Sequence, residues 1–157
     1  MKIYQLRSEL WLPQTRGEAF QFFADPRNLE RITPPWLRFQ MITPPETVAQ
    51  GTRLDYRLRL HGIPLRWQSE IVVWEPLQRF VDRQTHGPYS WWIHEHTFWE
   101  RDRGTLVVDR VEYAVPGGRL VQKFLVAPDL RRIFQYRRRI LEQLFTCGET
   151  TSARKTG

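Results

Sequence analysis

Hydrophobic and polar positions alternate with a period of two through the middle of the chain. The pattern is clearest in residues 52–62, where apolar or aromatic side chains alternate with charged ones: Leu54, Tyr56, Leu58 and Leu60 against Arg53, Asp55, Arg57 and Arg59. Such alternation is typical of a strand with one face in the core and one in water. The same pattern predicts about seven strands in all, at 2–13, 36–42, 52–62, 65–75, 79–86, 89–100 and 105–115. Their tight connections indicate one antiparallel meander.

Two short helices are expected between the first and second strands. Thr15, followed three residues later by Glu18, has the spacing of a capping box, which marks the start of a helix at residues 15–24. Residues 25–34 predict a second short helix, because the prolines at its end stop it there. The remaining strands of the sheet follow these two helices.

The last long element is helical. From residue 119 to 145, apolar side chains recur at helical intervals, with a break or kink expected at Pro128. A curved antiparallel sheet has to bury one face, and this helix is the only predicted element long enough to cover it. We therefore expect an α+β fold in which about seven strands wrap around a C-terminal helix and enclose space beneath it. Residues 1–147 form a single domain, and residues 148–157 form a polar flexible tail.

The aromatic content is high for a domain of this size. Of the 157 residues, 13% are aromatic, including seven Trp and nine Phe. A small domain rarely needs so many large rings to fill its core, so the composition favours a wide cavity lined by aromatic side chains. The alternative is an ordinary core with a few rings at the surface.

Several classes of protein are disfavoured by the sequence. A single cysteine, Cys147, allows no disulfide framework and no cysteine-rich zinc motif. The chain contains neither a signal-peptide pattern nor a membrane span, so we expect a cytoplasmic protein. The formal net charge is +7, but the arginines gathered in 131–139 are expected mostly on the solvated face of the last helix. No nucleic-acid motif accompanies this charge, and we expect no nucleic-acid partner. The oligomeric state stays open, with a homodimer possible.

Four segments carry a family resemblance: 12–36, 62–67, 80–100 and 109–118. Together with the order of elements, they resemble the START-like, or SRPBCC, superfamily, and within it the bacterial ligand-binding group with polyketide cyclase/dehydrase-like members. The resemblance spans residues 2–145 and implies a Bet v 1-like helix-grip fold. It does not determine an activity, because such proteins include lipid carriers, hormone receptors and cyclases.

Two histidines lie one residue apart in the aromatic run at 87–99. Alternate residues of a strand share a face, so one face would hold Trp92, His94, His96 and Phe98, and the other Trp91, Ile93, Glu95, Thr97 and Trp99. Periodicity does not decide between these faces, because both carry rings. The family resemblance favours the face with the histidines as the one turned toward the interior.

The next hairpin predicts a partner for these histidines. If its loop centres on Asp102 and Arg103, the residue numbers of cross-strand pairs sum to 205: His96 with Asp109, His94 with Val111, and Trp92 with Tyr113. A carboxylate beside an imidazole fixes its tautomer and raises its pKa. A loop of odd length would separate the pair.

A metal site would use both histidines with Asp82 or Asp109 as a third ligand. The sequence offers no evident fourth ligand, since His61 and His86 fall in or near turns. We therefore expect neither a metal nor another cofactor.

A catalytic site would use His96 as general acid or base, oriented by Asp109, to remove a proton next to a carbonyl in a cyclase or dehydratase reaction. Tyr56 or Tyr113 could donate a hydrogen bond to the developing enolate. No nucleophile elbow, phosphate loop or nucleotide fingerprint accompanies these residues. This is the alternative function.

The favoured function is the binding of a hydrophobic or aromatic small molecule, which could be lipid-, polyketide- or isoprenoid-like, between the sheet and the last helix. A third possibility is an interior filled by side chains and without a ligand, in which the histidines form hydrogen bonds with each other and with Asp109. The predicted ligand-binding residues are Tyr56, Leu58, Trp67, Phe80, Asp82, Gln84, Trp92, His94, His96, Phe98, Val111, Tyr113 and Phe124.

Overall fold

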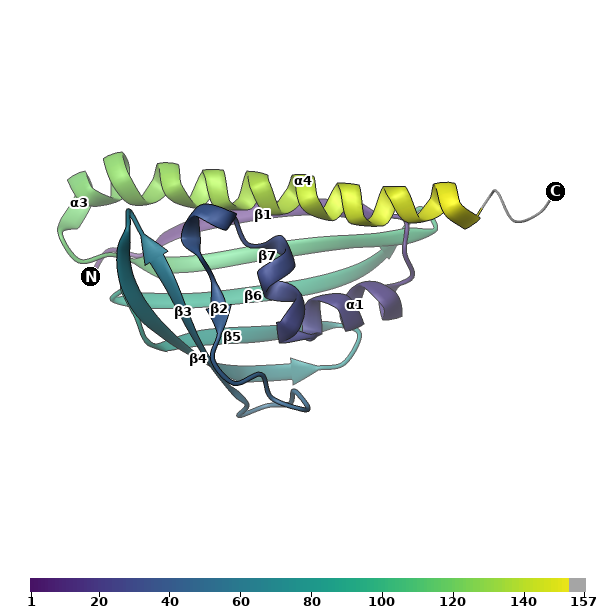
Figure 1. Ribbon diagram of the computed structural model, residues 1–157, viewed down its shortest axis with the longest axis horizontal. Coiled ribbons are helices and arrows are strands. Elements are labelled where there is room, and N and C mark those ends of the chain that lie inside the picture. The colour runs from purple at the N-terminus through teal and green to yellow at the C-terminus, as the bar shows by residue number, and fades with distance from the viewer. Residues whose placement is uncertain (153–157) are drawn as a thin grey trace.

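The computed structural model describes the chain at residues 1–152, with side chains described for residues 1–146 (Figure 1). Seven antiparallel strands form a single sheet in the order β1-β7-β6-β5-β4-β3-β2. Their bounds are Tyr4–Leu12, Gln40–Met41, Arg53–Leu60, Ile63–Glu75, Arg79–His86, Trp91–Arg101 and Gly104–Ala114 for β1 to β7. The α+β helix-grip arrangement is confirmed, because the sheet curves around the long helix α4, Ala127–Ser152.

The first helix lies on the same side of the sheet as α4. Helix α1, Arg16–Ala24, begins at the expected capping box: the Thr15 side chain accepts a hydrogen bond from the Glu18 amide, and the Glu18 carboxylate accepts one from the Thr15 amide. Phe22 of α1 packs edge-on against Phe145 near the C-terminal end of α4, with ring centroids 5.0 Å apart. The second short helix is also confirmed, as the 3-10 turn Pro26–Asn28 followed by α2, Leu29–Ile32.

The strand predicted at 36–42 is mostly wrong. Residues Pro35–Leu37 form a 3-10 turn, and only Gln40–Met41 pair with the sheet. The reason is local: proline fixes φ and has no N–H to give to a ladder, and Arg38 then takes a left-handed φ of 45°. The segment instead places buried Leu37 against the interior, while Trp36 stays exposed and packs edge-on against Tyr136 of α4.

The C-terminal helix does not break at Pro128. It starts with α3, Gly118–Val121, and continues through a π-helical stretch, Gln122–Val126, directly into α4. Proline excludes a normal hydrogen bond to the preceding turn, and the wider π turn lies where that bond would have formed. Figure 1 shows α3 at the end of the sheet near the N-terminus. The helix continues to Ser152, so 148–152 are helical where a tail is expected, and 153–157 lie outside the described residues.

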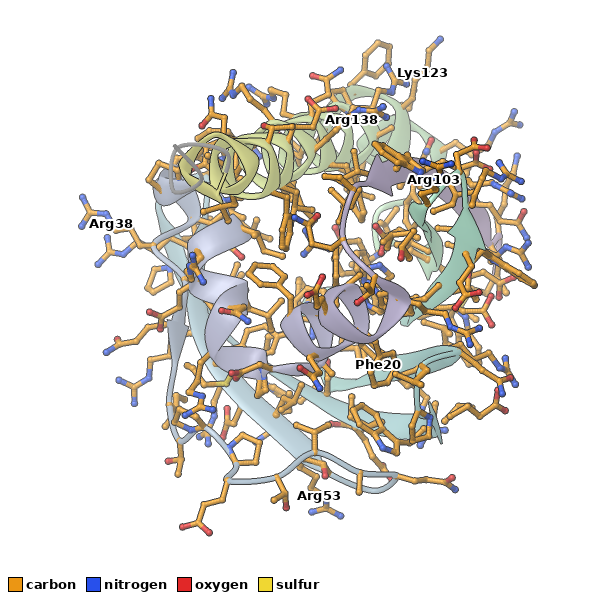
Figure 2. All side chains as sticks on the ribbon, turned by 90° about the vertical axis from the view of Figure 1, so that its right-hand side faces the viewer. Phe20, Arg38, Arg53, Arg103, Lys123 and Arg138 are labelled. Atoms are coloured by element: carbon orange, nitrogen blue, oxygen red, sulfur yellow. The ribbon has the colours of Figure 1, made fainter. Side chains whose placement is uncertain are left out.

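Apolar side chains fill two neighbouring parts of the interior. The first surrounds α1 and includes Phe20, Phe23, Phe80 and Phe98, and the second lies under the start of α4 and includes Trp67, Trp92, Tyr113 and Phe134. Charged side chains such as Arg38, Arg53 and Lys123 project away from the molecule (Figure 2). Among the described residues, no helix is long and apolar enough to cross a membrane.

The hairpin between β6 and β7 has the predicted register. Its two-residue turn is Asp102 and Arg103, with φ values of 50° and 61°. His96 lies opposite Asp109, His94 opposite Val111, and Trp92 opposite Tyr113, as the sum of 205 requires. Two left-handed residues give the turn the twist that an antiparallel hairpin needs.

Arg103→Gly should stabilise the protein, because glycine adopts the left-handed conformation without the steric cost that arginine incurs. We expect the free energy of unfolding, measured by urea denaturation, to rise by roughly 0.5–1 kcal/mol. The matched control is Arg101→Gly, at an extended strand position, which should lower it by a similar amount. Destabilisation of the same size by both substitutions would contradict the prediction.

Candidate functional site

A cavity of about 150 Å³ lies between the sheet and α4. Most of its lining is apolar and comes from β3, β4, β6, α4 and the short helical segments: Leu29, Leu37, Phe39, Leu54, Leu58, Leu60, Trp67, Trp92, Leu130, Ile133 and Phe134. The polar lining is confined to Thr33, Tyr56, Asp82, Tyr89, His94, His96 and Arg137. A second hollow of about 50 Å³ adjoins it, and Asp82, His96 and Arg137 line both.

Two imidazoles and two carboxylates form a buried cluster at one end of this cavity. Asp109 of β7 is the shared partner: its Oδ1 lies 2.9 Å from His94 Nε2 and 2.7 Å from His96 Nδ1. The first contact is a hydrogen bond, whereas the second is close but has a poor hydrogen-bond angle. On the other side, Asp82 Oδ2 of β5 lies 3.9 Å from His94 Nδ1 and 3.6 Å from His96 Nε2.

The two histidines respond differently to these surroundings. Burial lowers the pKa of His94, and the neighbouring charge of His96 lowers it further, against the opposing effect of Asp109. Burial also disfavours the charged form of His96, but the nearby carboxylates of Asp109 and Asp82 together outweigh it and raise its pKa. Burial acts to raise the pKa of Asp109, but the two histidines prevail and hold it well below its usual range. The cluster therefore favours a cationic His96 and a neutral His94.

Packing fixes the orientation of both rings. Phe80 stacks on His96 with centroids 4.4 Å apart, and Phe134 of α4 packs against His94 at 5.8 Å. The two imidazoles face each other at a centroid distance of 3.9 Å. Because each ring is held by an apolar neighbour and a shared carboxylate, neither can turn away without losing both contacts.

The wall of the cavity next to His94 is aromatic. Trp67 and Trp92 meet edge-to-face, with centroids 5.2 Å apart and planes at 90°. Buried Ser69 accepts a hydrogen bond from Trp67 Nε1 at 2.9 Å and lies 3.4 Å from the Tyr56 hydroxyl. Burial raises the pKa of Tyr56, so this phenol stays neutral. The wall therefore presents the faces and edges of its rings to the cavity, while the Trp67 indole N–H and the Tyr56 hydroxyl both lie near the Ser69 hydroxyl.

The structure brings together most of the residues that the sequence indicates. Seven line the larger cavity: Tyr56, Leu58, Trp67, Asp82, Trp92, His94 and His96. Phe80 lines the smaller hollow, while Phe98, Val111 and Tyr113 are buried in the surrounding core. Gln84 holds the turn before β6 instead, since its amide bonds the backbone of Tyr89.

The predicted place of Phe124 in the wall is wrong. Its side chain is 69% exposed and lies in the π-helical stretch before Pro128. A π turn has more residues than an α turn. It therefore rotates the residues before α4 relative to the row of buried apolar side chains on α4. The periodicity that indicated Phe124 therefore does not carry across this stretch.

Sequence reasoning missed Arg137, which it assigned to the solvated face of the helix. Arg137 lines both hollows, and its Nε and Nη1 are shielded from solvent without a hydrogen-bond partner among the described residues. Its guanidinium lies 5.2 Å from the ring centroid of Phe134. A signal was present, because Arg137 falls at helical spacing between buried Phe134 and Leu141.

Family comparison agrees with this architecture. Residues 12–140 match the model of the family described as "Polyketide cyclase / dehydrase and lipid transport". The chain belongs to this family. The match covers most of the sheet and much of α4, including every residue of the His–Asp cluster. Comparison with curated proteins gives no match.

Solved structures share the fold at low sequence identity. Protein Ms6760 from Mycobacterium smegmatis is 17% identical with a TM-score of 0.68, covering 94% of this chain and 98% of that one. Protein CV1439 from Chromobacterium violaceum is 12% identical with a TM-score of 0.72, covering 90% and 96%. The di-domain ARO/CYC StfQ from the steffimycin biosynthetic pathway is 13% identical with a TM-score of 0.71, covering 94% of this chain and 52% of that one. Such identities show the fold alone, and with the family match they confirm the SRPBCC resemblance.

The opposite pKa shifts of the two histidines predict a distinctive titration. In metal-free protein, His96 should titrate above, and His94 below, the ordinary imidazole value of 6.5. Because the pKa of His96 is raised in the folded protein, the stability that His96 contributes is lost as the pH rises through that pKa. Because the pKa of His94 is lowered, the stability that His94 contributes falls as the pH drops below 6.5. Stability from this pair should therefore decline on both sides of that value.

Nitrogen–proton NMR of the imidazoles checks this, with His94→Gln and His96→Gln used for assignment. Two buried imidazoles that titrate together, and not on either side of 6.5, would contradict the prediction.

Proposed function

We propose that the protein binds a small aromatic molecule with an acidic group in the cavity between the sheet and α4. The observation that carries this proposal is a partly open, largely apolar hollow in which two donors of Arg137 are shielded from solvent and lack a hydrogen-bond partner among the described residues. Small-molecule sites are mostly apolar with a few polar groups that fix the orientation of the guest. The family to which the chain belongs is described as "Polyketide cyclase / dehydrase and lipid transport", and this supports the binding of a small molecule.

The size of the cavity suits a single ring. A hollow of about 150 Å³ is comparable to engineered apolar cavities that accept benzene. A longer lipid-, polyketide- or isoprenoid-like guest would need the smaller hollow as well. Asp82, His96 and Arg137 lie between the two spaces, so rotation of these side chains would join them.

The polar end favours an acid over a neutral guest. A guanidinium N–H forms a strong, charge-assisted hydrogen bond with a carboxylate, and a buried donor without a partner is costly. Nε and Nη1 of Arg137 are two such donors, on different edges of the guanidinium, and each can pair with one acidic oxygen. An acidic group placed there would pair this charge, while the ring lies against Trp67 and Trp92.

Isothermal titration with benzoate and with toluene tests the role of Arg137. Arg137→Met should weaken benzoate binding by roughly 10- to 100-fold, the value of a hydrogen bond to a charged group, and leave toluene binding unchanged. Arg139→Met, an exposed position on the same helix, is the matched control and should change neither affinity.

Three results would count against the proposal. They are the absence of binding of both compounds to the wild type, an equal loss of both affinities in Arg137→Met, and an effect of Arg139→Met as large as that of Arg137→Met. Native mass spectrometry of freshly purified protein gives a second readout, because a retained aromatic acid would support the same assignment.

We infer a second candidate, an enzyme of cyclase or dehydratase type, from the geometry of His96. Its Nδ1 lies 2.7 Å from Asp109, and its Nε2 is on the side of Asp82 and the cavity. An imidazole oriented by a carboxylate, with its other nitrogen toward the guest, has the arrangement of a general acid–base catalyst.

Exchange of the α-protons of phenylacetone into deuterium oxide, followed by NMR, tests this candidate in metal-free protein. Wild type should accelerate exchange, and His96→Gln should lower the catalysed rate by roughly 100-fold or more while benzoate still binds. His86→Gln is the control with unchanged rate. Equal rates for wild type and His96→Gln would exclude His96 as the base.

Three sequence-based expectations stay predictions: a cytoplasmic location, no nucleic-acid partner, and a possible homodimer. The arginines of α4 bear on the second of these, because Arg131, Arg132, Arg138 and Arg139 are all exposed, as a solvated face requires. Arg132 and Arg138 also pair with acidic residues of the same helix, which reduces their attraction for phosphate.

A further inference from the structure

Three potential metal ligands meet where β5 and β6 pair. Asp82 lies directly opposite His94 in the ladder, and His96 follows on the same face of β6. One ligand atom from each of the three residues lies within 4.8 Å of the other two. The sequence left Asp82 and Asp109 as alternatives for the third ligand, and the strand pairing selects Asp82.

Two of the three spacings between these ligand atoms are close to those around one shared ion. Ligand atoms bound at about 2.0–2.2 Å around a tetrahedral ion lie roughly 3.4 Å from one another. Asp82 Oδ2 is 3.6 Å from His96 Nε2 and 3.9 Å from His94 Nδ1. Rotation of the Asp82 carboxylate, which is only partly buried, can close these two differences of a few tenths of an ångström. The two imidazole nitrogens lie within 4.8 Å of each other, so an ion would also draw the rings together by up to about 1.4 Å.

Asp109 supplies an independent observation that points to a metal. It contacts the far nitrogen of each ring, His94 Nε2 and His96 Nδ1, through the same oxygen. With protons on those nitrogens, the lone pair of neutral His94 lies on Nδ1, and an ion that binds His96 displaces the proton from its Nε2. These are the two nitrogens that face Asp82. Metal-binding histidines are oriented in this way by a carboxylate behind them.

We propose that Asp82, His94 and His96 bind one divalent transition-metal ion at the polar end of the cavity, with Asp109 as the carboxylate that positions both histidines. Two imidazoles and a carboxylate favour ions such as Zn²⁺ or Co²⁺ over Mg²⁺ or Ca²⁺, which prefer oxygen ligands. The ion's two positive charges offset the two carboxylates of the cluster. All three ligands line the cavity, so the remaining coordination positions face the guest.

This site goes beyond the proposed function, because an ion needs no organic guest to bind there. It also competes with the second candidate, since an ion on His96 Nε2 occupies the lone pair that a general base would use. An acidic guest held by Arg137 lies close enough to these ligands to share the same end of the cavity.

The test uses the full-length protein, stripped with EDTA and titrated with Co²⁺ followed by visible absorption, and with Zn²⁺ followed by calorimetry. We expect one ion per chain. His94→Gln, His96→Gln and Asp82→Asn should each weaken Zn²⁺ binding by about 100-fold or more. Asp109→Asn should weaken it by roughly 10- to 100-fold, as loss of a carboxylate behind a metal-bound histidine does.

The matched control replaces the two histidines outside the cluster, His61→Ala with His86→Ala, and should leave Zn²⁺ affinity unchanged. Circular dichroism reports whether each variant folds. If a histidine variant does not fold, the Zn²⁺ affinity of Asp82→Asn decides the test, because this substitution changes the shape of the side chain least. Unchanged affinity in Asp82→Asn, loss of affinity in the control, or no binding by wild type would overturn the proposal. Benzoate binding by the metal-free wild type separates failure of this site from failure of the cavity proposal.

Discussion

The buried carboxylate of Asp109 is the constraint on which the site depends. A carboxylate removed from water costs several kcal/mol unless charge and hydrogen bonds replace the lost hydration. Here two imidazoles of the neighbouring strand supply that replacement through a single oxygen, at 2.9 Å and 2.7 Å. Their positions follow from the β6–β7 register. A shift of one residue would turn both histidines to the outer face of the sheet and leave Asp109 unpaired.

The cluster also divides the interior into two apolar regions. His96 lies against Phe80 and Phe23 in the region under α1, and His94 lies against Phe134 and Trp92 in the region under α4. A polar layer with aromatic contacts on both flanks holds its side chains in one arrangement, which a binding or reactive site requires. The two hollows lie on either side of this layer, so it reaches both.

A hollow beside such a layer lowers the stability of the fold. Side chains around a hollow of about 150 Å³ lose packing contacts that a filled core would keep. Arg137 adds the cost of buried donors without a partner. Both costs are relieved by a guest that fills the space and carries an acidic group. Core side chains ordinarily pack without voids. A hollow that lowers the stability of the fold is therefore typical of a functional site.

The sequence by itself determined the elements and much of the cluster. Alternation identified six of the seven strands, Thr15 with Glu18 marked the first helix, and the two-residue turn at Asp102 and Arg103 paired His96 with Asp109. These features are local, since each depends on residues close in the chain or on one tight hairpin. Only the tertiary structure decided that Asp82 faces both histidines, that Arg137 turns inward, and that Phe124 turns outward. The first outcome depends on the register of β5 with β6, which the loop between them sets. The other two depend on the rotation of the helix at its π-helical stretch, which packing against segments distant in the sequence determines.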